Sequence, residues 1–306
     1  MKTNTSALSF LLVLLFFFQS VQGQGLPTAR PEEVGLSAAR LERIKPFMQS
    51  YVDQGKLSGL ITMIARRGRV VHFEKYGVMD SGRPMQLDAI FRIASMTKPI
   101  TSTAIMMLYE EGKFQLNDPV SKFIPGFKDV KVFSGTDENG IKLEEAKNPM
   151  TIRDLLTHTS GLTYGDFGDT PVDMMYRKAD LQGGTLKEMV DKLTKLPLLY
   201  QPGTKWNYSV STDVLGYIVE VISGKPLDEF FQQRIFSPLR MSDTGFYVPK
   251  EKINRFTALY ELAKDGKIFV GETPQASRFA KPPNIWAAAA GLCQPQRIIC
   301  GSHRCC

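Results

Sequence analysis

The sequence predicts an α/β protein that carries a helical subdomain, and three observations lead to this fold class. Residues 59–77, GLITMIARRGRVVHFEKYG, form two β-rich runs that meet at Arg67-Gly68 and predict an antiparallel hairpin. The middle of the chain contains mostly segments with helical spacing, and residues 266–272, GKIFVGE, have the pattern of a late strand. A hairpin followed by a helix-rich middle is typical of a mixed body whose remaining strands come near the C-terminus.

Composition and charge fit a globular protein. The 306 residues are 43% hydrophobic and 23% charged, which is enough for one large domain or two entwined ones. The formal net charge is +7, and the longest run of basic residues is the pair Arg66-Arg67. Because a phosphate-binding surface needs clustered basic side chains, we expect no nucleic acid partner.

The N-terminus resembles an export signal over residues 1–23. Lys2 precedes an apolar stretch over 7–18 that contains one serine, and Val21 and Gly23 are small residues suited to a cleavage site. No later segment approaches the roughly 20 apolar residues of a membrane helix, so we expect no stable membrane span after removal of the signal. The prediction is a secreted or periplasmic protein, with an uncleaved anchor as the alternative.

The first predicted elements after the signal are a helix and the hairpin. Ser37 is a candidate N-cap for a helix that ends before Gly55, and Pro46 should bend this helix. Alternate residues of the hairpin over 59–77 should face a core. His72 lies in the second of its two runs, and we interpret it as a structural residue.

Six segments in the middle of the chain predict helices, with no internal repeat and no low-complexity linker between them. We therefore expect one domain over residues 24–292, followed by an atypical tail over 293–306. The helical segments cover residues 100–111, 121–127, 150–158, 185–197, 211–224 and 227–239.

A serine and a lysine three residues apart, Ser95 and Lys98, stand before the nearly all-apolar run ITSTAIMML over 100–108. Residues three apart share a face of a helix, so the serine Oγ and the lysine Nζ could meet. A helix without a polar face is usually buried, and burial disfavours a charged ammonium. Lys98 could then take the proton of Ser95. The alternative is a solvated helix start, because this spacing is common.

A nucleophilic serine also needs a group that returns its proton to the leaving group. Tyr208 in QPGTKWNYSVSTDVLG precedes a predicted helix and is a candidate, although a single loop tyrosine often serves packing alone. A Ser-His-Asp hydrolase is the obvious rival. The chain has no G-x-S-x-G motif, Ser160 does not follow a strand, and we expect His158 to order its loop.

Four ordered blocks of the chain resemble the class C β-lactamase-like serine hydrolases of the β-lactamase and penicillin-binding protein superfamily, and especially the family VIII carboxylesterases. The resemblance runs from about residue 35 to residue 271. It implies a β-lactamase-like fold, with an antiparallel sheet flanked by helices and a helical subdomain. The blocks are FRIASMTKPITSTAIMMLYEEGKFQLNDPV, MTIRDLLTHTSGL, QPGTKWNYSVSTDVLGYIVE and IFSPLRMSDTGF.

The resemblance implies that Ser95 forms an acyl-enzyme, that Lys98 is its proton partner and that Tyr208 is the general base. Val210 replaces the asparagine of the family's Y-x-N motif, and we expect an apolar pocket wall that suits an ester. The predicted substrate is a small-molecule ester or amide, and we expect no cofactor and no metal. The alternatives are a β-lactamase or D,D-peptidase, and a non-catalytic scaffold with this fold.

The C-terminus departs from the family pattern, because nothing after Tyr208 supplies the family's third motif, which with the N–H of Ser95 forms the oxyanion hole. We expect the C-terminal strands to be missing, so the activity of the 306 residues alone does not follow from the resemblance. GGC glycine codons read one base late become alanine, so residues 287–290 suggest a frameshift; the alternative is a natural divergent tail. All four cysteines lie in the last 14 residues, with no zinc-type spacing.

Overall fold

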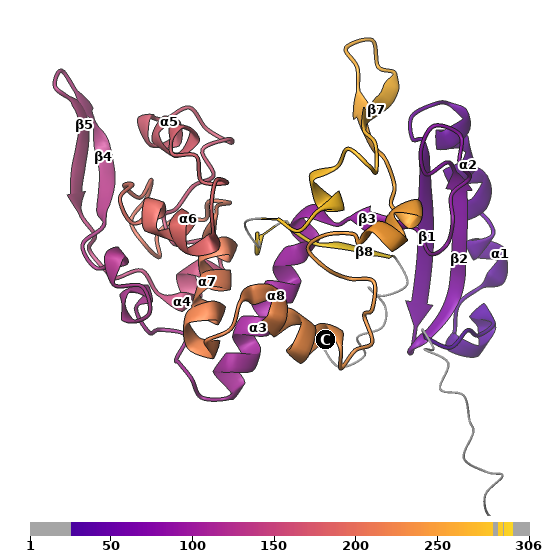
Figure 1. The fold of residues 1–306 in the computed structure, drawn as a ribbon, viewed down its shortest axis with the longest axis horizontal. Coiled ribbons are helices and arrows are strands. Elements are labelled where there is room, and N and C mark those ends of the chain that lie inside the picture. The colour runs from indigo at the N-terminus through magenta and orange to yellow at the C-terminus, as the bar shows by residue number, and fades with distance from the viewer. Residues whose placement is uncertain (1–25, 284–286, 290, 296–306) are drawn as a thin grey trace, which may run out of the picture.

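The structure is a computed structural model that describes residues 26–283, 287–289 and 291–295. The predicted signal over 1–23 and the tail beyond 295 lie outside the described residues. The β1–β2 hairpin lies at one end of the molecule and the helices around α7 (Ser211–Ser223) lie toward the other (Figure 1). Helix α3 (Thr97–Glu110) and two short strands lie between them.

The predicted N-terminal helix is divided into α1 (Ala38–Leu41) and α2 (Ile44–Asp53). The Ser37 side chain caps α1 by accepting a hydrogen bond from the Arg40 N–H, as the sequence predicts. Pro46 lies in the first turn of α2, where its missing N–H costs little, so the chain breaks just before it. Gly55 follows α2 with a φ of +65°, a left-handed conformation that glycine adopts without strain.

Strands β1 (Gly59–Arg66) and β2 (Arg69–Gly77) form the predicted antiparallel hairpin, with α2 packed on β2. The expectation that alternate residues face a core is wrong. Every residue of β1 is at least partly exposed, and only Val70 and Tyr76 of β2 are buried. The reason is that, within the described ranges, the two strands form a two-stranded sheet of their own. The His72 Nε2 lies 2.6 Å from the Thr62 Oγ1, which confirms its structural role.

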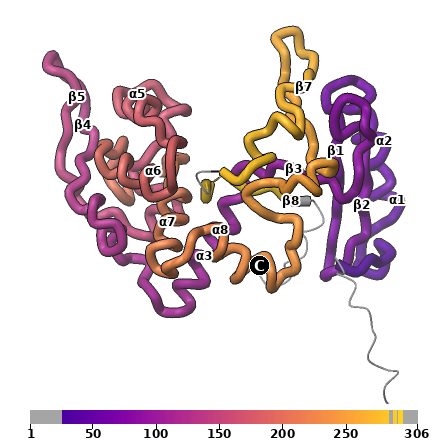
Figure 2. The backbone as a smooth tube through the Cα atoms, in the orientation of Figure 1, coloured from indigo at the N-terminus to yellow at the C-terminus, as the bar shows by residue number. Residues whose placement is uncertain are grey.

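Four short strands, β3 (Ile90–Arg92), β6 (Leu259–Leu262), β7 (Ile268–Glu272) and β8 (Cys293–Pro295), form two separate pairs. β7 is the late strand that the sequence predicts, and it pairs with β6. β3 pairs antiparallel with β8, so the first third of the chain lies beside its last described residues (Figure 2). Cys293, the first residue after the predicted domain, is buried and lies opposite Arg92 in this pair.

The largest core cluster joins α3 to the helical subdomain. This subdomain consists of α4 (Ile152–Leu156), α5 (Pro171–Lys178), α6 (Leu186–Leu193), α7 and α8 (Leu227–Phe231). α7 is its central element, because it contacts α3, α4, α6 and α8. Reciprocal hydrogen bonds of Thr151, Thr170 and Thr185 with the acidic residue three positions later fix the starts of α4, α5 and α6.

Two parts of the middle region differ from the prediction. The segment 121–127 contains short 3₁₀ turns at Val120–Lys122 and Pro125–Phe127 in place of a helix. Strands β4 (Lys131–Asp137) and β5 (Gly140–Glu145) form a hairpin that the sequence analysis missed. All six residues of β5 are exposed, so no buried face imposes an apolar alternation on its sequence.

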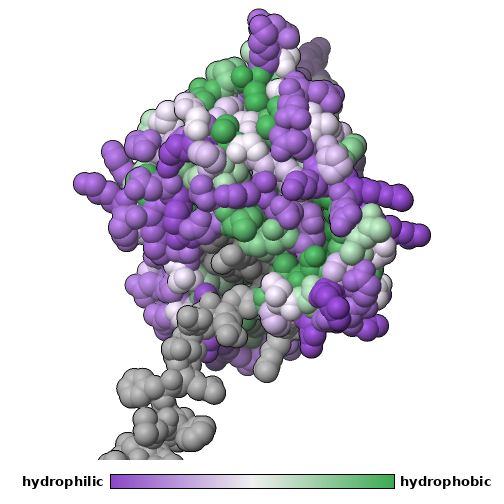
Figure 3. All heavy atoms as spheres, turned by 90° about the vertical axis from the view of Figure 1, so that its right-hand side faces the viewer, coloured by the Kyte–Doolittle hydropathy of each residue, from purple (hydrophilic) through white to green (hydrophobic). Residues whose placement is uncertain are grey.

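The surface at the β1–β2 end mixes hydrophilic side chains with scattered hydrophobic ones (Figure 3). Phe47 of α2 is one of the large exposed hydrophobic residues here, with 56% of its surface accessible, and its ring packs edge-on against Tyr51. Scattered apolar residues of this kind are normal on protein surfaces.

Candidate active site

Ser95 lies in a 3₁₀ turn, Ala94–Met96, that leads directly into α3. Ala94 adopts a φ of +43°, which is strained for a residue with a side chain. The turn is anchored from the far end of the chain, because the Ile93 N–H donates to the Leu292 carbonyl over 3.0 Å. The Ser95 side chain is exposed at the mouth of α3, as the sequence predicts.

Lys98 lies on the next turn, and its Nζ donates to the Ser95 Oγ over 3.2 Å. The same ammonium donates to the Ala289 carbonyl over 3.1 Å. It also lies 4.6 Å from the centre of the Tyr208 ring, within the range of a cation–π contact. The prediction that the serine and the lysine meet is confirmed, and Lys98 is half-buried between three polar or aromatic partners.

Tyr208 reaches Ser95 from the loop before α7, and its OH donates to the Ser95 Oγ over 2.7 Å. Burial raises the pKa of this phenol, but hydrogen bonds with Lys98 and Ser95 and the positive charge of Lys98 outweigh it. The pKa of Tyr208 therefore falls below its usual value. A lowered pKa places a larger fraction of the tyrosine in the phenolate form near neutral pH, and only the phenolate can take the serine proton.

The loop that carries Tyr208 is fixed by buried hydroxyl groups. The Ser211 Oγ lies 2.7 Å from both the Ser160 Oγ and the Ser209 Oγ. The His158 Nδ1 is 3.4 Å from the Ser209 Oγ, and its backbone carbonyl accepts from the Asn207 N–H over 2.8 Å. His158 thus holds the tyrosine loop, in agreement with the prediction that it orders a loop.

A peptide segment over 287–289 closes the site behind Lys98. The Asp213 carboxylate, at the start of α7, accepts from the Ala289 N–H over 3.0 Å, and the Thr101 hydroxyl donates to the Ala288 carbonyl over 2.6 Å. Burial raises the pKa of Asp213 to about 6, although backbone N–H groups and Lys98 favour the ionised form. The backbone N–H of Ala289 therefore contacts Asp213, and its backbone carbonyl contacts Lys98.

Val210 differs from its predicted role. Its side chain is 2% exposed and belongs to the main core cluster, so it is not a wall of an open pocket. The reason is its position directly before α7, whose apolar residues belong to the same core cluster. An apolar residue fits this place because no polar partner is needed there.

Ser95, Lys98 and Tyr208, the three residues selected from the sequence, converge within hydrogen-bond distance. The supporting roles of Ser209, Ser211 and Asp213 were not predicted from the sequence. All three lie in YSVSTD, and the Ser211 partner Ser160 lies in TSGL, but only the fold brings these two blocks together.

A serine that shares its Oγ with a lysine of the following helix and a tyrosine of another segment defines the class of serine–lysine acyl-transfer proteins. The match of a family model agrees with this class. The beta-lactamase family model matches residues 44–294, and the chain belongs to this family. It has the β-lactamase-like fold that the sequence predicts, and the match extends past the alanine run that suggested a frameshift.

Three similar proteins illustrate the family. Protein Rv1367c of Mycobacterium tuberculosis is 36% identical over 242 residues, which are 78% of this chain and 60% of that protein. Esterase EstB of Burkholderia gladioli is 34% identical over 227 residues, which are 72% of this chain and 54% of the esterase. The chain thus spans little more than half the length of these relatives.

The structure of EstCE1, described as a hydrolase with promiscuous acyltransferase activity, superposes on this chain with a TM-score of 0.70 at 26% identity. The match covers 85% of this chain and 71% of EstCE1.

Two further properties concern the described part of the chain. No group of three or more His, Cys, Asp or Glu side chains there is arranged to hold a metal ion. Among the same residues, each helix is too short or too polar to cross a membrane.

Proposed function

We propose that this protein is a serine hydrolase that cleaves carboxylic esters through an acyl-serine intermediate. The observation that carries the proposal is the convergence on one atom, the Ser95 Oγ, of hydrogen bonds from Lys98 and Tyr208. A serine hydroxyl becomes a nucleophile when neighbouring groups take and hold its proton. Substrate is expected to enter at the exposed side of Ser95.

The geometry supports a distinct role for each of the three residues. Once Tyr208 has lost its phenolic proton, the Ser95 hydroxyl donates to the phenolate, and this proton moves to Tyr208 as the Ser95 Oγ attacks the ester carbonyl. Lys98 donates to Ser95 and to a backbone carbonyl, so it acts as a cation that stabilises the phenolate. Tyr208 then returns the proton to the leaving alkoxide, and water releases the acyl group by the reverse steps.

Two findings favour an ester over a penicillin or a peptide as the substrate. Val210 cannot supply the amide that family members use for acylamido side chains, because its side chain is apolar and buried in the core. EstB, the 34% identical relative from Burkholderia gladioli, is named an esterase. An ester also has a better leaving group than an amide, so it places a smaller demand on the oxyanion donors.

The test compares Ser95→Ala with Ser134→Ala, an exposed serine on β4. We expect p-nitrophenyl butyrate turnover and fluorophosphonate labelling to disappear in Ser95→Ala, with a rate loss of about 10³-fold or more, and to persist in Ser134→Ala. Equal rates in both variants would show that the nucleophile is misassigned. Faster turnover of nitrocefin than of the ester would favour a β-lactamase. A folded protein without label at Ser95 would favour a scaffold.

We also propose that the protein is exported to the periplasm or outside the cell. The supporting observation is the apolar stretch after Lys2 with small residues before Gln24. Mass spectrometry of the N-terminus of the protein recovered from its native cell tests this proposal. A mature chain that begins near residue 24 is the expected result, and an intact chain in the cytoplasm would contradict it.

A further inference from the structure

The ring of Tyr208 lies within a cluster of four other aromatic side chains. The ring centres of His158, Tyr164, Phe167 and Trp206 lie 5.0, 5.3, 5.8 and 6.4 Å from that of Tyr208. These are ordinary distances for aromatic contacts. Two members of the cluster remain largely open to solvent, because Phe167 is 73% and Trp206 is 63% exposed. Large exposed aromatic rings beside a nucleophile are suited to contact a ligand.

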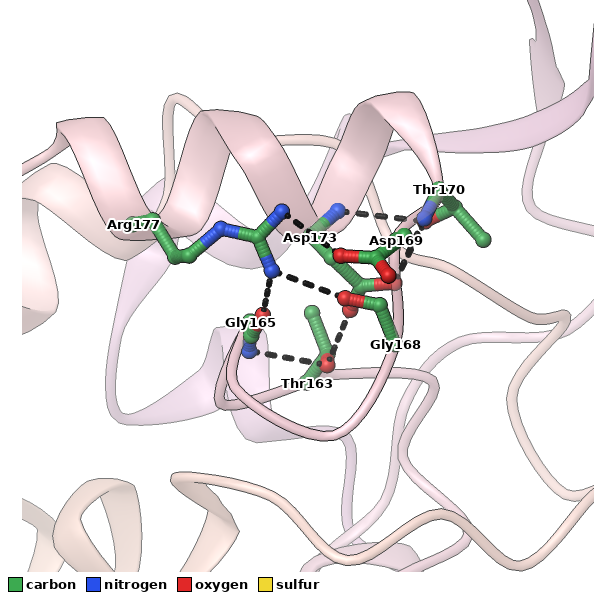
Figure 4. A network of polar contacts seen from close by, with 7 residues as sticks. All are labelled: Thr163, Gly165, Gly168, Asp169, Thr170, Asp173 and Arg177. Atoms are coloured by element: carbon green, nitrogen blue, oxygen red, sulfur yellow. Dashed lines mark hydrogen bonds and ion pairs between the residues drawn. The ribbon is translucent and has the colours of Figure 1, made fainter.

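The loop that carries Tyr164 and Phe167 is held in place before any ligand arrives (Figure 4). The buried Asp173 carboxylate accepts from the Thr163 hydroxyl over 2.7 Å and from the Thr170 hydroxyl over 2.7 Å. The Arg177 guanidinium donates to the carbonyls of Gly165 and Gly168, the latter over 2.8 Å. Both ends and the middle of the loop are therefore attached to α5. We call the exposed rings of Phe167, on this loop, and Trp206 the aromatic wall. Because the loop is already fixed, it loses little conformational entropy when a ligand binds.

The proposed role of Tyr208 determines which part of the substrate contacts the aromatic wall. Tyr208 must come within hydrogen-bond distance of the leaving alkoxide, since it returns the proton that Ser95 loses. The alkoxy oxygen of the ester therefore lies at the Tyr208 OH. The group attached to that oxygen then extends along the rings that surround the tyrosine.

We propose that Phe167 and Trp206 form a binding subsite for the alcohol part of the substrate and favour esters of planar aromatic alcohols. The inference rests on the proposed function and specifies its substrate class. Planar rings stack on exposed aromatic faces, and the exposed Trp206 ring is nearly parallel to that of Tyr208, with an interplanar angle of 21°. The acyl part of the ester lies on the other side of Ser95 and does not touch this wall.

The kinetic signature follows from the order of the steps. The alcohol departs when the acyl-enzyme forms, so the subsite affects acylation, which kcat/KM reports. Deacylation is common to all esters with the same acyl group. Loss of one aromatic contact should lower kcat/KM by about 2- to 13-fold for an aromatic alcohol, as expected from the strength of single aromatic pairs.

The experiment uses two ester series with the wild-type protein and with Phe167→Ala and Trp206→Ala. The first series keeps the butyryl group and compares 2-naphthyl butyrate with methyl butyrate. The second keeps methanol and compares methyl butyrate with methyl benzoate. We expect both variants to lose kcat/KM for 2-naphthyl butyrate alone. Each substrate is compared with itself across variants, so differences in leaving-group reactivity cancel.

Phe47→Ala is the matched control, because Phe47 is also exposed and also packs against a tyrosine, but on α2 at the hairpin end (Figure 1). It should leave all three rates unchanged. Trp206 is two residues from Tyr208, so Trp206→Phe is added as a conservative variant that should restore most of the selectivity. Arg177→Met tests the loop, and we expect it to lower the naphthyl ester rate more than the methyl ester rate.

The results separate this inference from the proposed function. An equal loss for 2-naphthyl and methyl butyrate would overturn the subsite and indicate damage to Tyr208 itself. A loss confined to methyl benzoate would place the wall on the acyl side and overturn the inference. Unchanged rates in both alanine variants would also overturn it. Absence of turnover with every ester, together with absence of fluorophosphonate label at Ser95, would overturn the proposed function instead.

Discussion

The buried Asp213 carboxylate leads to a quantitative prediction about stability and pH. Its side chain is 4% exposed, its Oδ1 accepts from the Ala289 N–H, and burial raises its pKa to about 6 from an ordinary value of 3.8. The substitution Asp213→Asn keeps an oxygen that can accept the same hydrogen bond but removes the titrating proton. The difference between the two proteins therefore isolates the ionisation of this carboxyl.

The sign follows from the two pKa values. The folded protein binds the Asp213 proton more tightly than the unfolded chain, so the contribution of this group to stability is complete below pH 3.8. It is lost as the pH rises through about 6. At 1.36 kcal/mol per pKa unit the total loss is about 3 kcal/mol, of which about 2 kcal/mol falls between pH 4 and pH 7. The Asp213→Asn protein should not show this fall in stability, because its amide does not ionise.

The assay is urea unfolding of both proteins at pH 4, 5, 6 and 7, followed by circular dichroism. Other acids titrate in the same range, but they are present in both proteins and cancel in the difference. We expect the stability of wild type minus that of Asp213→Asn to fall by about 2 kcal/mol from pH 4 to pH 7. A difference that stays flat, or that rises with pH, would refute the argument from burial.

Three further predictions concern other parts of the site and core. Tyr208→Phe should lower kcat/KM for esters by about 10²- to 10⁴-fold and abolish the rise in rate with pH through the lowered tyrosine pKa, which a pH–rate profile measures. Gly216→Ala should cost about 1 to 3 kcal/mol in urea unfolding, because its Cβ would lie 2.3 Å from the Ala288 Cβ; full stability would contradict this contact. Cys293 is 1% exposed and burial raises its pKa to about 12, so iodoacetamide should label it only in urea, as peptide mapping can establish.

Local features of this fold could be predicted because their causes lie within a few residues. The cap at Ser37 and the meeting of Ser95 with Lys98 each depend on backbone geometry over three or four positions, and Pro46 marks the irregular part of the first helix, predicted as a bend and found as a break. The helix α7 also follows from its own residues, because an apolar stretch after a polar start and before Gly224 defines both its ends.

Long-range strand pairing could not be predicted in the same way. β3 has three residues and pairs with β8, about two hundred positions later in the chain. A three-residue strand carries no periodic pattern, and its partner is chosen by the rest of the fold. The aromatic wall was missed for a related reason. Phe167 and Trp206 belong to separate loops, and only the packing around Tyr208 places their rings together.

The alanine run over 287–290 illustrates a function that no pattern of side chains can reveal. From the sequence, a row of alanines before scattered cysteines suggests a frameshift, because glycine codons read one base late become alanine. In the structure the segment acts through its peptide groups, since the Ala289 N–H binds Asp213 and its carbonyl binds Lys98. Small side chains are required there, because Ala288 packs against Gly216. Sequencing of the gene still tests the frameshift, but both contacts are made by backbone atoms, so any residue at position 289 can make them if its N–H stays beside Asp213 and its carbonyl beside Lys98.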